Sequence, residues 1–285
     1  AKTITRTVAE EAFTLLKKQG LHYKVLTLTA KEKICFCGEP DCNPEKCPYA
    51  KGHFSRINDA IYALLQERDC FDRDTVLEYA ERFMVCPFEM SLDTATWADD
   101  IIGDYNYVFD PNVYLKRFFA EGTRGDYIFL VDEAHNLVER SREMYSAIIY
   151  KEDFLLAKKI LKKCGQAKLM RELEKCNRVL LSYKRDCEKY VIYESIGNFA
   201  FELMNVASDL DEFLQKAPEF PERKDLSEFY LNLRNFLNIY ELLDDHYVVY
   251  AEHEQDGRFK LKLYCVDPSK NLQERINKGL SLIHI

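Results

Sequence analysis

Hydrophobic positions along the chain follow two different periods, which together predict a mixed α/β protein. Apolar residues recur every three or four positions over residues 7–18, 54–66 and 75–84, the spacing of amphipathic helices. Residues 24–29 alternate between apolar and polar, whereas residues 127–131 are continuously apolar, as in a parallel strand buried on both faces. An α/β fold with at least one parallel strand is therefore expected.

A further helix is expected shortly before the second strand. Asp110 and Pro111 combine an N-cap residue with a proline at the first helical position, which predicts a helix from there to about Phe119. Gly122 and Gly125 then mark a turn. This helix would lead through the turn into the apolar strand.

Residues 151–245 carry an almost unbroken helical pattern. Its helical segments span residues 154–164, 169–191, 196–215 and 226–243. Two strands follow, joined through Asp256-Gly257, a dipeptide typical of hairpin turns. The whole chain has a net charge of −8, but residues 151–200 are richer in Lys and Arg than in Asp and Glu. Because binding to phosphates depends on local basic surface, the acidic total does not exclude nucleic acid.

The chain contains ten cysteines, and four of them crowd into residues 31–49, a segment without apolar periodicity. Residues 1–7 have no apolar core of a secretion signal, so a reducing, cytoplasmic location is expected and the thiols should be free or metal-bound. The thiols outside the candidate metal site are expected to be small buried hydrophobes: Cys70, Cys164, Cys176, Cys187 and Cys265.

Four thiols, Cys35, Cys42, Cys47 and Cys86, have a spacing that suits a shared metal centre. Four thiolates can hold either an iron–sulfur cluster or a tetrahedral zinc ion. Zinc modules usually show two short Cys-x-x-Cys pairs, and this sequence has none, yet spacing alone leaves zinc open. Cys37 is an alternative to Cys35 as the first ligand.

Two adjacent carboxylates, Asp132 and Glu133, follow the apolar strand directly. The carboxyl end of a parallel strand is where open α/β sheets bind ligands. Hydrolysis of a nucleoside triphosphate needs a divalent cation and an oriented water. We therefore expect Asp132 to hold Mg²⁺ and Glu133 to act as general base towards the water. The competing interpretation is an acidic strand end without catalytic function.

The segment after the third candidate ligand combines cations with aromatic rings. Lys51, His53 and Arg56 suit single-stranded DNA, where cations meet phosphates and rings stack on bases. An ordinary amphipathic helix start would carry the same residues. Tyr105 and Tyr107 equally suit base stacking and core packing.

Several blocks, in this order, resemble the XPD/DinG family of iron–sulfur DNA helicases in superfamily 2. The strand ending in Asp132-Glu133-Ala134-His135 resembles the Walker B strand and DEAH box of that family. The other matching blocks are Thr5-Arg6-Thr7, Thr27-Leu28-Thr29-Ala30-Lys31 and Asp104-Tyr105-Asn106-Tyr107. Together the blocks cover most of residues 1–150.

The resemblance implies an α/β fold with two insertions. Residues 1–30, 98–150 and 246–285 would form part of a RecA-like motor domain. Residues 31–97 would form an iron–sulfur cluster domain, and residues 151–245 a helical Arch-like insertion. In the family these two insertions enclose a hole through which one DNA strand passes.

The resemblance also implies roles for individual residues. It implies a 4Fe–4S cluster on Cys35, Cys42, Cys47 and Cys86, with Cys35 preferred to Cys37 because of its distance from the Thr-Ala-Lys block. Mg²⁺ and ATP would bind at Asp132, and His135 would couple the nucleotide site to DNA. The implied DNA contacts lie at Thr5, Arg6, Thr7, Lys51, His53, Arg56 and Tyr107.

Parts of such a motor are not in the sequence. The phosphate-binding loop needs a Gly-Lys dipeptide, and none occurs, so the loop is expected upstream. The family's Ser-Ala-Thr motif and second motor domain are also missing. Residues 280–285 do not resemble the family's continuation, which suggests a truncated reading frame or a foreign tail. We expect this chain, truncated at both ends, to be inactive alone.

The expected function is that of a fragment of an ATP-dependent 5′→3′ DNA helicase. Its parent would translocate on single-stranded DNA and unwind forked duplex in DNA repair, as a monomer. No apolar run reaches the ~18 residues of a membrane span, so no membrane contact is expected. The alternatives are a non-catalytic module that binds single-stranded DNA and a structural domain stabilised by zinc.

Overall fold

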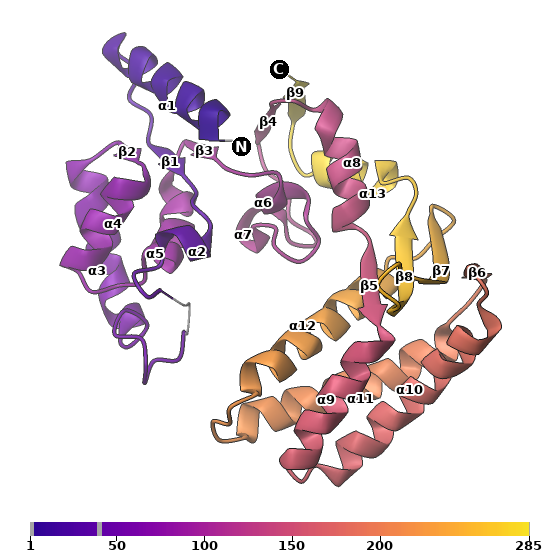
Figure 1. Ribbon diagram of the computed structural model, residues 1–285. Helices are drawn as coiled ribbons and strands as arrows, with labels where there is room; N and C mark the ends of the chain where they lie inside the picture. The colour runs from indigo at the N-terminus through magenta and orange to yellow at the C-terminus, as the bar shows by residue number, and fades with distance from the viewer. Residues whose placement is uncertain (1–2, 39–41, 285) are drawn as a thin grey trace.

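The computed structural model describes residues 3–38 and 42–284, which fold into three packed units (Figure 1). An N-terminal unit runs from α1 to β3, a middle unit surrounds β4, and a helical unit carries a small antiparallel sheet. None of the helices in these ranges combines the length and apolar character that crossing a membrane requires.

The N-terminal unit is a three-stranded parallel sheet with helices around it. Its elements are α1 (Thr3–Lys18), β1 (Val25–Thr27), α2 (Lys31–Ile34), α3 (His53–Glu67), β2 (Cys70–Phe71), α4 (Arg73–Arg82), α5 (Pro87–Thr94), η1 (Ala95–Trp97) and β3 (Asp100–Ile102). The strand order β2-β1-β3 makes β1 central, and Leu26 lies in one core with Phe71 and Tyr79. Asp72 begins α4 because its carboxylate accepts a hydrogen bond from the Thr75 N–H at 2.8 Å.

The middle unit packs around a parallel pair of strands, β4 and β9. Its elements are α6 (Asn106–Phe109), α7 (Lys116–Phe119), β4 (Ile128–Val131), α8 (His135–Met144), α13 (Ser269–Ile276) and β9 (Ser281–His284). Phe109, Phe129 and Leu272 lie in its core. The C-terminal segment, which the sequence analysis expected not to continue the family pattern, forms a strand that pairs with β4 up to His284; residue 285 lies outside the described residues.

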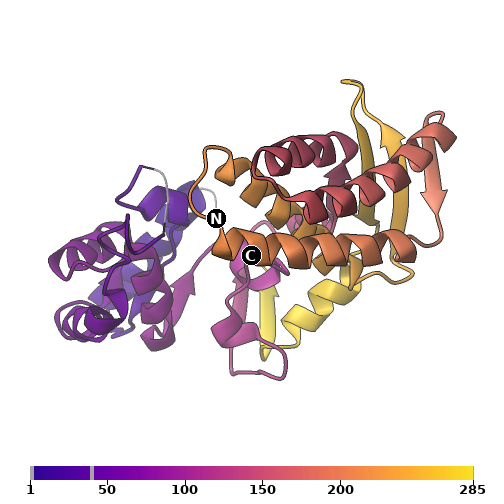
Figure 2. The ribbon, with the colours of Figure 1, turned by 90° about the horizontal axis from the view of Figure 1, so that it is seen from below.

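The helical unit is a layer of four helices on one face of a four-stranded sheet. Its elements are β5 (Ala147–Tyr150), α9 (Lys151–Lys163), α10 (Ala167–Asp186), β6 (Tyr190–Tyr193), α11 (Gly197–Lys216), α12 (Arg223–Tyr240), β7 (Tyr247–His253) and β8 (Phe259–Cys265). The strands are antiparallel in the order β5-β8-β7-β6, and the long helices lie side by side (Figure 2). Ile149, Val249 and Leu261 share one core with Phe199 and Leu233.

The helical unit does not follow the expected domain boundaries. Strands β7 and β8 fall within residues 246–285, which the sequence assigned to the motor domain, yet their inward side chains belong to the helical core. Strand β5, at the end of range 98–150, joins the same core. Only α13 and β9 pack in the middle unit. The boundaries differ because these strands pair with partners that are distant in the sequence. The local sequence pattern does not show which unit such a strand joins.

The helix expected from Asp110 to Phe119 is shorter than predicted. Only Lys116–Phe119 is helical. The Asp110 carboxylate accepts hydrogen bonds from the backbone N–H groups of Asn112 at 2.8 Å and Val113 at 3.2 Å. A side chain that closes a turn in this way competes with helix formation, so the proline-containing segment remains a turn.

The strand expected at residues 127–131 forms, but it is not buried on both faces. Phe129 and Val131 point into the core of the middle unit, whereas Ile128 and Leu130 are exposed. The run of apolar residues therefore predicted the strand correctly. It did not predict that, among the described residues, only one face of the strand is covered.

Polar contacts at two places join the helical unit to the other units at a distance from its sheet. The Asn112 side chain donates to Asn235 Oδ1 at 2.8 Å and accepts from Asn238 Nδ2 at 2.9 Å, which ties the turn at 110–113 to α12. At the far end of the helices, Lys46 Nζ lies 3.3 Å from Glu219 Oε1 and links the cysteine segment to the connection between α11 and α12.

The helical core makes a matched test possible on α12, where Leu233 is fully buried and Leu231 is 61% exposed. Leu233→Ala should lower the free energy of unfolding by about 2–5 kcal/mol, because it removes buried methyl groups and leaves a cavity. Leu231→Ala should change it by no more than about 0.5 kcal/mol. Urea unfolding followed by circular dichroism measures both; equal effects would contradict the packing described for α12.

Candidate functional site

The acidic turn after β4 is the first candidate site. Asp132 follows the last residue of β4, and Glu133 adopts a left-handed backbone conformation with φ of 49°. Such a conformation is uncommon for a residue other than glycine and occurs often at functional sites. The Glu133 carboxylate lies 3.3 Å from His135 Nε2, and both side chains are exposed while Asp132 is half-buried. The carboxylates and the imidazole can therefore be reached from solvent.

Tyr105 holds this turn in place. Its hydroxyl donates to the Asp132 carbonyl oxygen and lies 3.2 Å from the Glu133 carbonyl oxygen. Burial raises the pKa of Tyr105, and the Asp132 carboxylate raises it further, so the hydroxyl keeps the proton that it donates. The structure thus brings together two of the sequence blocks, 104–107 and the acidic strand end.

Arg140 on α8 also supports the acidic turn, because it holds Tyr105 in place. It was not among the residues predicted from the sequence. Its guanidinium lies 5.6 Å from the Tyr105 ring centroid and 3.6 Å from Asp104 Oδ1. A cation over an aromatic face and beside a carboxylate fixes both partners. The spacing His135 to Arg140 carries no motif, so only the fold shows that Arg140 faces the 104–107 block.

The acidic turn has the chemistry of a Mg²⁺–nucleotide site. Carboxylate oxygens are the hard ligands that Mg²⁺ prefers, and the side chains of Asp132 and Glu133 stand at the carboxyl end of a parallel strand. An exposed carboxylate next to the metal ligand is placed to accept a proton from water. The residues present therefore fit the expected ion and substrate.

The cysteine segment is the second candidate site, and α2 and α5 position two of its sulfurs. Cys35 follows the last residue of α2, and Cys86 is the N-cap of α5. Burial raises the pKa of the Cys86 thiol and outweighs the backbone N–H groups of Phe88 and Glu89 at the start of α5, which lower it. Amide groups at a helix N-terminus stabilise a thiolate, the form in which cysteine binds metal.

The other candidate ligands come from the loop between α2 and α3. Cys47 is buried, and it hydrogen-bonds to Cys37. Burial raises the pKa of the Cys37 thiol to about 11, with further contributions from Cys47 and Cys35. Cys42 is exposed and hydrogen-bonds to Lys31, an interaction that raises the pKa of that lysine. Cys42 also acts electrostatically on Cys86.

The sulfurs do not form a site of the size of a single ion. Over residues 3–38 and 42–284, the group of at least three His, Cys, Asp or Glu side chains with ligand atoms all within 4.8 Å of one another is Asp244, Asp245 and His246. In that group Lys270 lies 2.7 Å from an Asp244 oxygen and offsets its charge. Tetrahedral zinc with Zn–S bonds of ~2.3 Å would bring four sulfurs within about 4 Å of one another. An iron–sulfur cluster is a larger body held by the same donor type, and four thiols on one loop and one helix start fit it chemically.

His53 and Arg56, predicted as DNA contacts, are engaged inside the protein. His53 is only 4% exposed, and its Nδ1 accepts the backbone N–H of Cys86 at 3.2 Å. Arg56 donates to the carbonyl oxygens of Lys51, Phe83 and Met84, which fixes the end of α4. The imidazole is buried and the guanidinium donates three hydrogen bonds to the backbone, so in this structure both side chains support the cysteine segment. Lys51 is exposed.

The remaining predicted DNA residues lie in two places. Thr5, Arg6 and Thr7 are in the first turns of α1, where Arg6 Nε lies 3.9 Å from Glu10 Oε1. Glu10 also accepts a hydrogen bond from the Thr27 hydroxyl at 2.9 Å, which connects α1 to β1. Tyr107 is half-buried in the core of the N-terminal unit, and burial raises its pKa.

Comparison with known proteins identifies the family. The DEAD_2 family matches residues 10–154, about half of the chain, and no curated protein matches. A solved structure titled "Truncated XPD" is 17% identical with a TM-score of 0.57, and the alignment covers 100% of this chain and 78% of that one. A second, titled "XPD_Helicase", is 19% identical with a TM-score of 0.48 over 93% of this chain.

The chain spans 45% of the length of the "XPD_Helicase" structure. The DEAD_2 match contains the cysteine segment, the 104–107 block and the acidic turn held by Tyr105. The fold is shared with "Truncated XPD" over the whole chain. This protein therefore belongs to the DEAD_2 family, and its fold is similar to that of "Truncated XPD".

Proposed function

We propose that the chain forms part of an ATP-dependent DNA helicase that moves 5′→3′ along single-stranded DNA and unwinds forked duplex during DNA repair. The observation that carries this proposal is the acidic turn, with Asp132 and Glu133 at the end of β4 and the backbone of both residues tied to Tyr105. Few functions other than metal-assisted hydrolysis need two carboxylates fixed in this place.

In this proposal each residue of the turn has a separate task. Asp132 binds the Mg²⁺ of Mg²⁺–ATP, and that ion offsets charge on the phosphates when it is bound. The Glu133 carboxylate accepts a proton from the attacking water. His135 lies 3.3 Å from that carboxylate at the start of α8, so it can respond to the protonation and position of Glu133.

The support from Tyr105 gives a route from DNA to the nucleotide. Tyr105 belongs to the same short segment as Tyr107, which packs in the N-terminal unit beside the cysteine segment. A shift of that unit would move the Tyr105 hydroxyl and the carbonyl groups that it holds. We propose that DNA bound near the cysteine segment acts on the acidic turn in this way.

We also propose that Cys35, Cys42, Cys47 and Cys86 hold a 4Fe–4S cluster. Support comes from the position of Cys86 at the N-terminus of α5, the burial of Cys47 and the contacts of His53 and Arg56 that stabilise the segment. A cluster would link the loop between α2 and α3 to the start of α5, two parts that are distant in sequence.

The first test concerns Glu133 in a protein that combines this segment with a phosphate-binding loop. Glu133→Gln should lower the rate of ATP hydrolysis by about 10²- to 10⁴-fold, since it removes the general base, while ATP still binds. The matched control is Glu139→Gln on the exposed side of α8, which should hydrolyse ATP at the unaltered rate. Undiminished turnover in Glu133→Gln would refute the assigned role.

The second test identifies the metal and its ligands in anaerobically purified protein. Cys42→Ser, Cys47→Ser and Cys86→Ser should each lose most of the iron and the visible absorbance of the cluster, because each removes one of four thiolates. Cys35→Ser should do the same and Cys37→Ser should not; Cys70→Ser is the control. Zinc without iron in the unaltered protein would end the cluster proposal, and iron loss only in Cys37→Ser would exchange the first ligand.

A further inference from the structure

The sheet of the helical unit has a second face that the helices do not cover. Side chains along a strand alternate between faces, so the strands whose inward residues fill the helical core must present the intervening residues outward. On the edge strand β6, Tyr190 and Ile192 are 65% and 62% exposed. Helices α9–α12, whose position beside this sheet Figure 1 shows, pack against the inward residues of the strands.

The strand register collects three tyrosines and a lysine on this surface. Ile192 pairs with Tyr250, and Tyr250 pairs with Lys262, so these three side chains form one row across β6, β7 and β8. Tyr264 lies two residues beyond Lys262 on the same face, with its ring centroid 4.7 Å from Lys262 Nζ. Tyr190 lies two residues from Ile192 at the open edge. We call Tyr190, Ile192, Tyr250, Lys262 and Tyr264 the tyrosine face.

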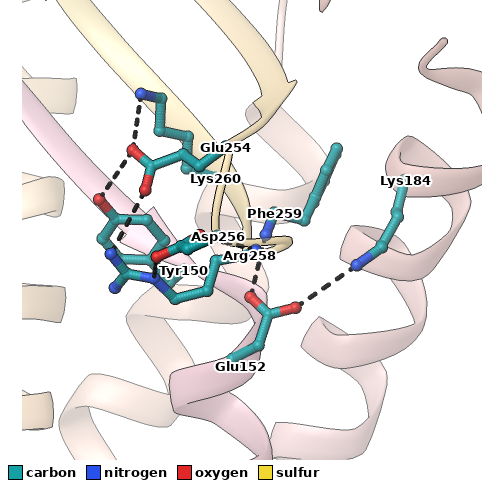
Figure 3. Close-up of polar contacts among 8 residues, drawn as sticks. All are labelled: Tyr150, Glu152, Lys184, Glu254, Asp256, Arg258, Phe259 and Lys260. Carbon is teal, nitrogen blue, oxygen red and sulfur yellow. Dashed lines mark hydrogen bonds and ion pairs between the residues drawn. The ribbon is translucent and has the colours of Figure 1, made fainter. Parts of the chain in front are cut away.

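The neighbouring charges belong to a separate, closed network at the β7–β8 hairpin (Figure 3). Lys260 lies 2.7 Å from Glu252 and 2.9 Å from Glu254, and although burial alone lowers the pKa of Lys260, these hydrogen bonds raise it. The Tyr150 hydroxyl donates to Glu254, and Arg258 lies 4.1 Å from the Tyr150 ring centroid. The acidic groups next to the tyrosine face are thus already matched by cations.

Lys262 is different from Lys260. Among the residues that the structure describes, no carboxylate oxygen lies within 4.0 Å of its ammonium group. Burial lowers the pKa of Lys262, and the charge of Lys260 lowers it further, whereas the carboxylates of Glu252 and Glu143 oppose the change. An ammonium beside a tyrosine ring, with no carboxylate in direct contact, can bind an anion from outside.

We propose that the tyrosine face binds single-stranded nucleic acid. The exposed Tyr190 and the partly exposed Tyr250 and Tyr264 offer rings on which bases stack. Lys262, which lies beside the Tyr264 ring and pairs across the strands with Tyr250, is placed to receive a phosphate. A four-stranded sheet with aromatic side chains on its free face is a known way to hold two or three unpaired bases.

This site is separate from the proposed motor and does not depend on it. The tyrosine face lies on strands of the helical unit, whereas the acidic turn and the cysteine segment belong to the other two units. A strand leaving or approaching the motor would gain a second, sequence-tolerant contact here. The competing occupant of an exposed apolar strand edge is a second copy of the chain, and the test below separates the two.

Fluorescence anisotropy with labelled oligothymidylate and oligouridylate of equal length tests the site in the full chain. Tyr190→Ala and Lys262→Gln together should weaken binding by about 5- to 150-fold, since base stacking and a phosphate contact are lost. Tyr190→Phe should retain the unaltered affinity, because the ring that stacks is preserved. Tyr23→Ala and Lys159→Gln are matched exposed controls on other elements and should bind like the unaltered chain.

Photocrosslinking with oligonucleotides that carry 5-iodouracil locates the contact. Crosslinked peptides should contain Tyr190, Tyr250 or Tyr264, and the paired substitution should remove them. Unchanged affinity in that variant, or crosslinks confined to residues 1–150, would overturn the proposal and leave the motor proposal intact. A dimer that Ile192→Lys dissociates, without crosslinks on the sheet, would overturn it in favour of contact between copies. Failure of the motor proposal is seen separately, in ATP hydrolysis.

Discussion

The hydroxyl of Tyr105 is the contact on which the arrangement of the site depends. It joins the 104–107 segment to the backbone of Asp132 and Glu133, and Arg140 holds the same ring from α8. A left-handed residue at the end of a strand is unfavourable unless its surroundings fix it, and here the hydroxyl and the guanidinium do so. The 104–107 segment therefore connects the unit that carries the cysteines, where Tyr107 packs, to the turn that carries the carboxylates, which Tyr105 holds.

Local pattern predicted the regular elements well, because helices such as α3 and α4 show their period over three or four turns. It failed at residues 110–113, where an Asp-Pro start signal became a turn closed by the Asp110 carboxylate. It also divided the chain at residue 246, although β8 pairs with β5 across more than a hundred residues. Both differences arise from interactions that a window of sequence does not contain.

For the site, the residue types were predictable and their partners were not. The adjacent carboxylates and the cysteines stand out by type and spacing, and the structure places the carboxylates at a strand end and Cys35 and Cys86 at helix ends. His53 and Arg56 look like phosphate ligands in sequence, but the fold turns them towards the backbone of Cys86 and the end of α4. An arginine that donates to backbone carbonyl groups cannot be told from one that binds phosphates by its sequence alone.

Because β5 pairs with β8, the helical unit is an insertion whose two ends lie side by side. The chain enters it through Ala147–Tyr150 and leaves it through Phe259–Cys265, and these strands lie next to each other. Ser146 Oγ accepts the Cys265 N–H at 2.9 Å, so the two connecting points meet at the border with α8. An insertion whose ends meet can lengthen, shrink or be exchanged during evolution without displacing the strands around it. Sequence variation in this family can thus accumulate in the helical unit while the acidic turn keeps its geometry.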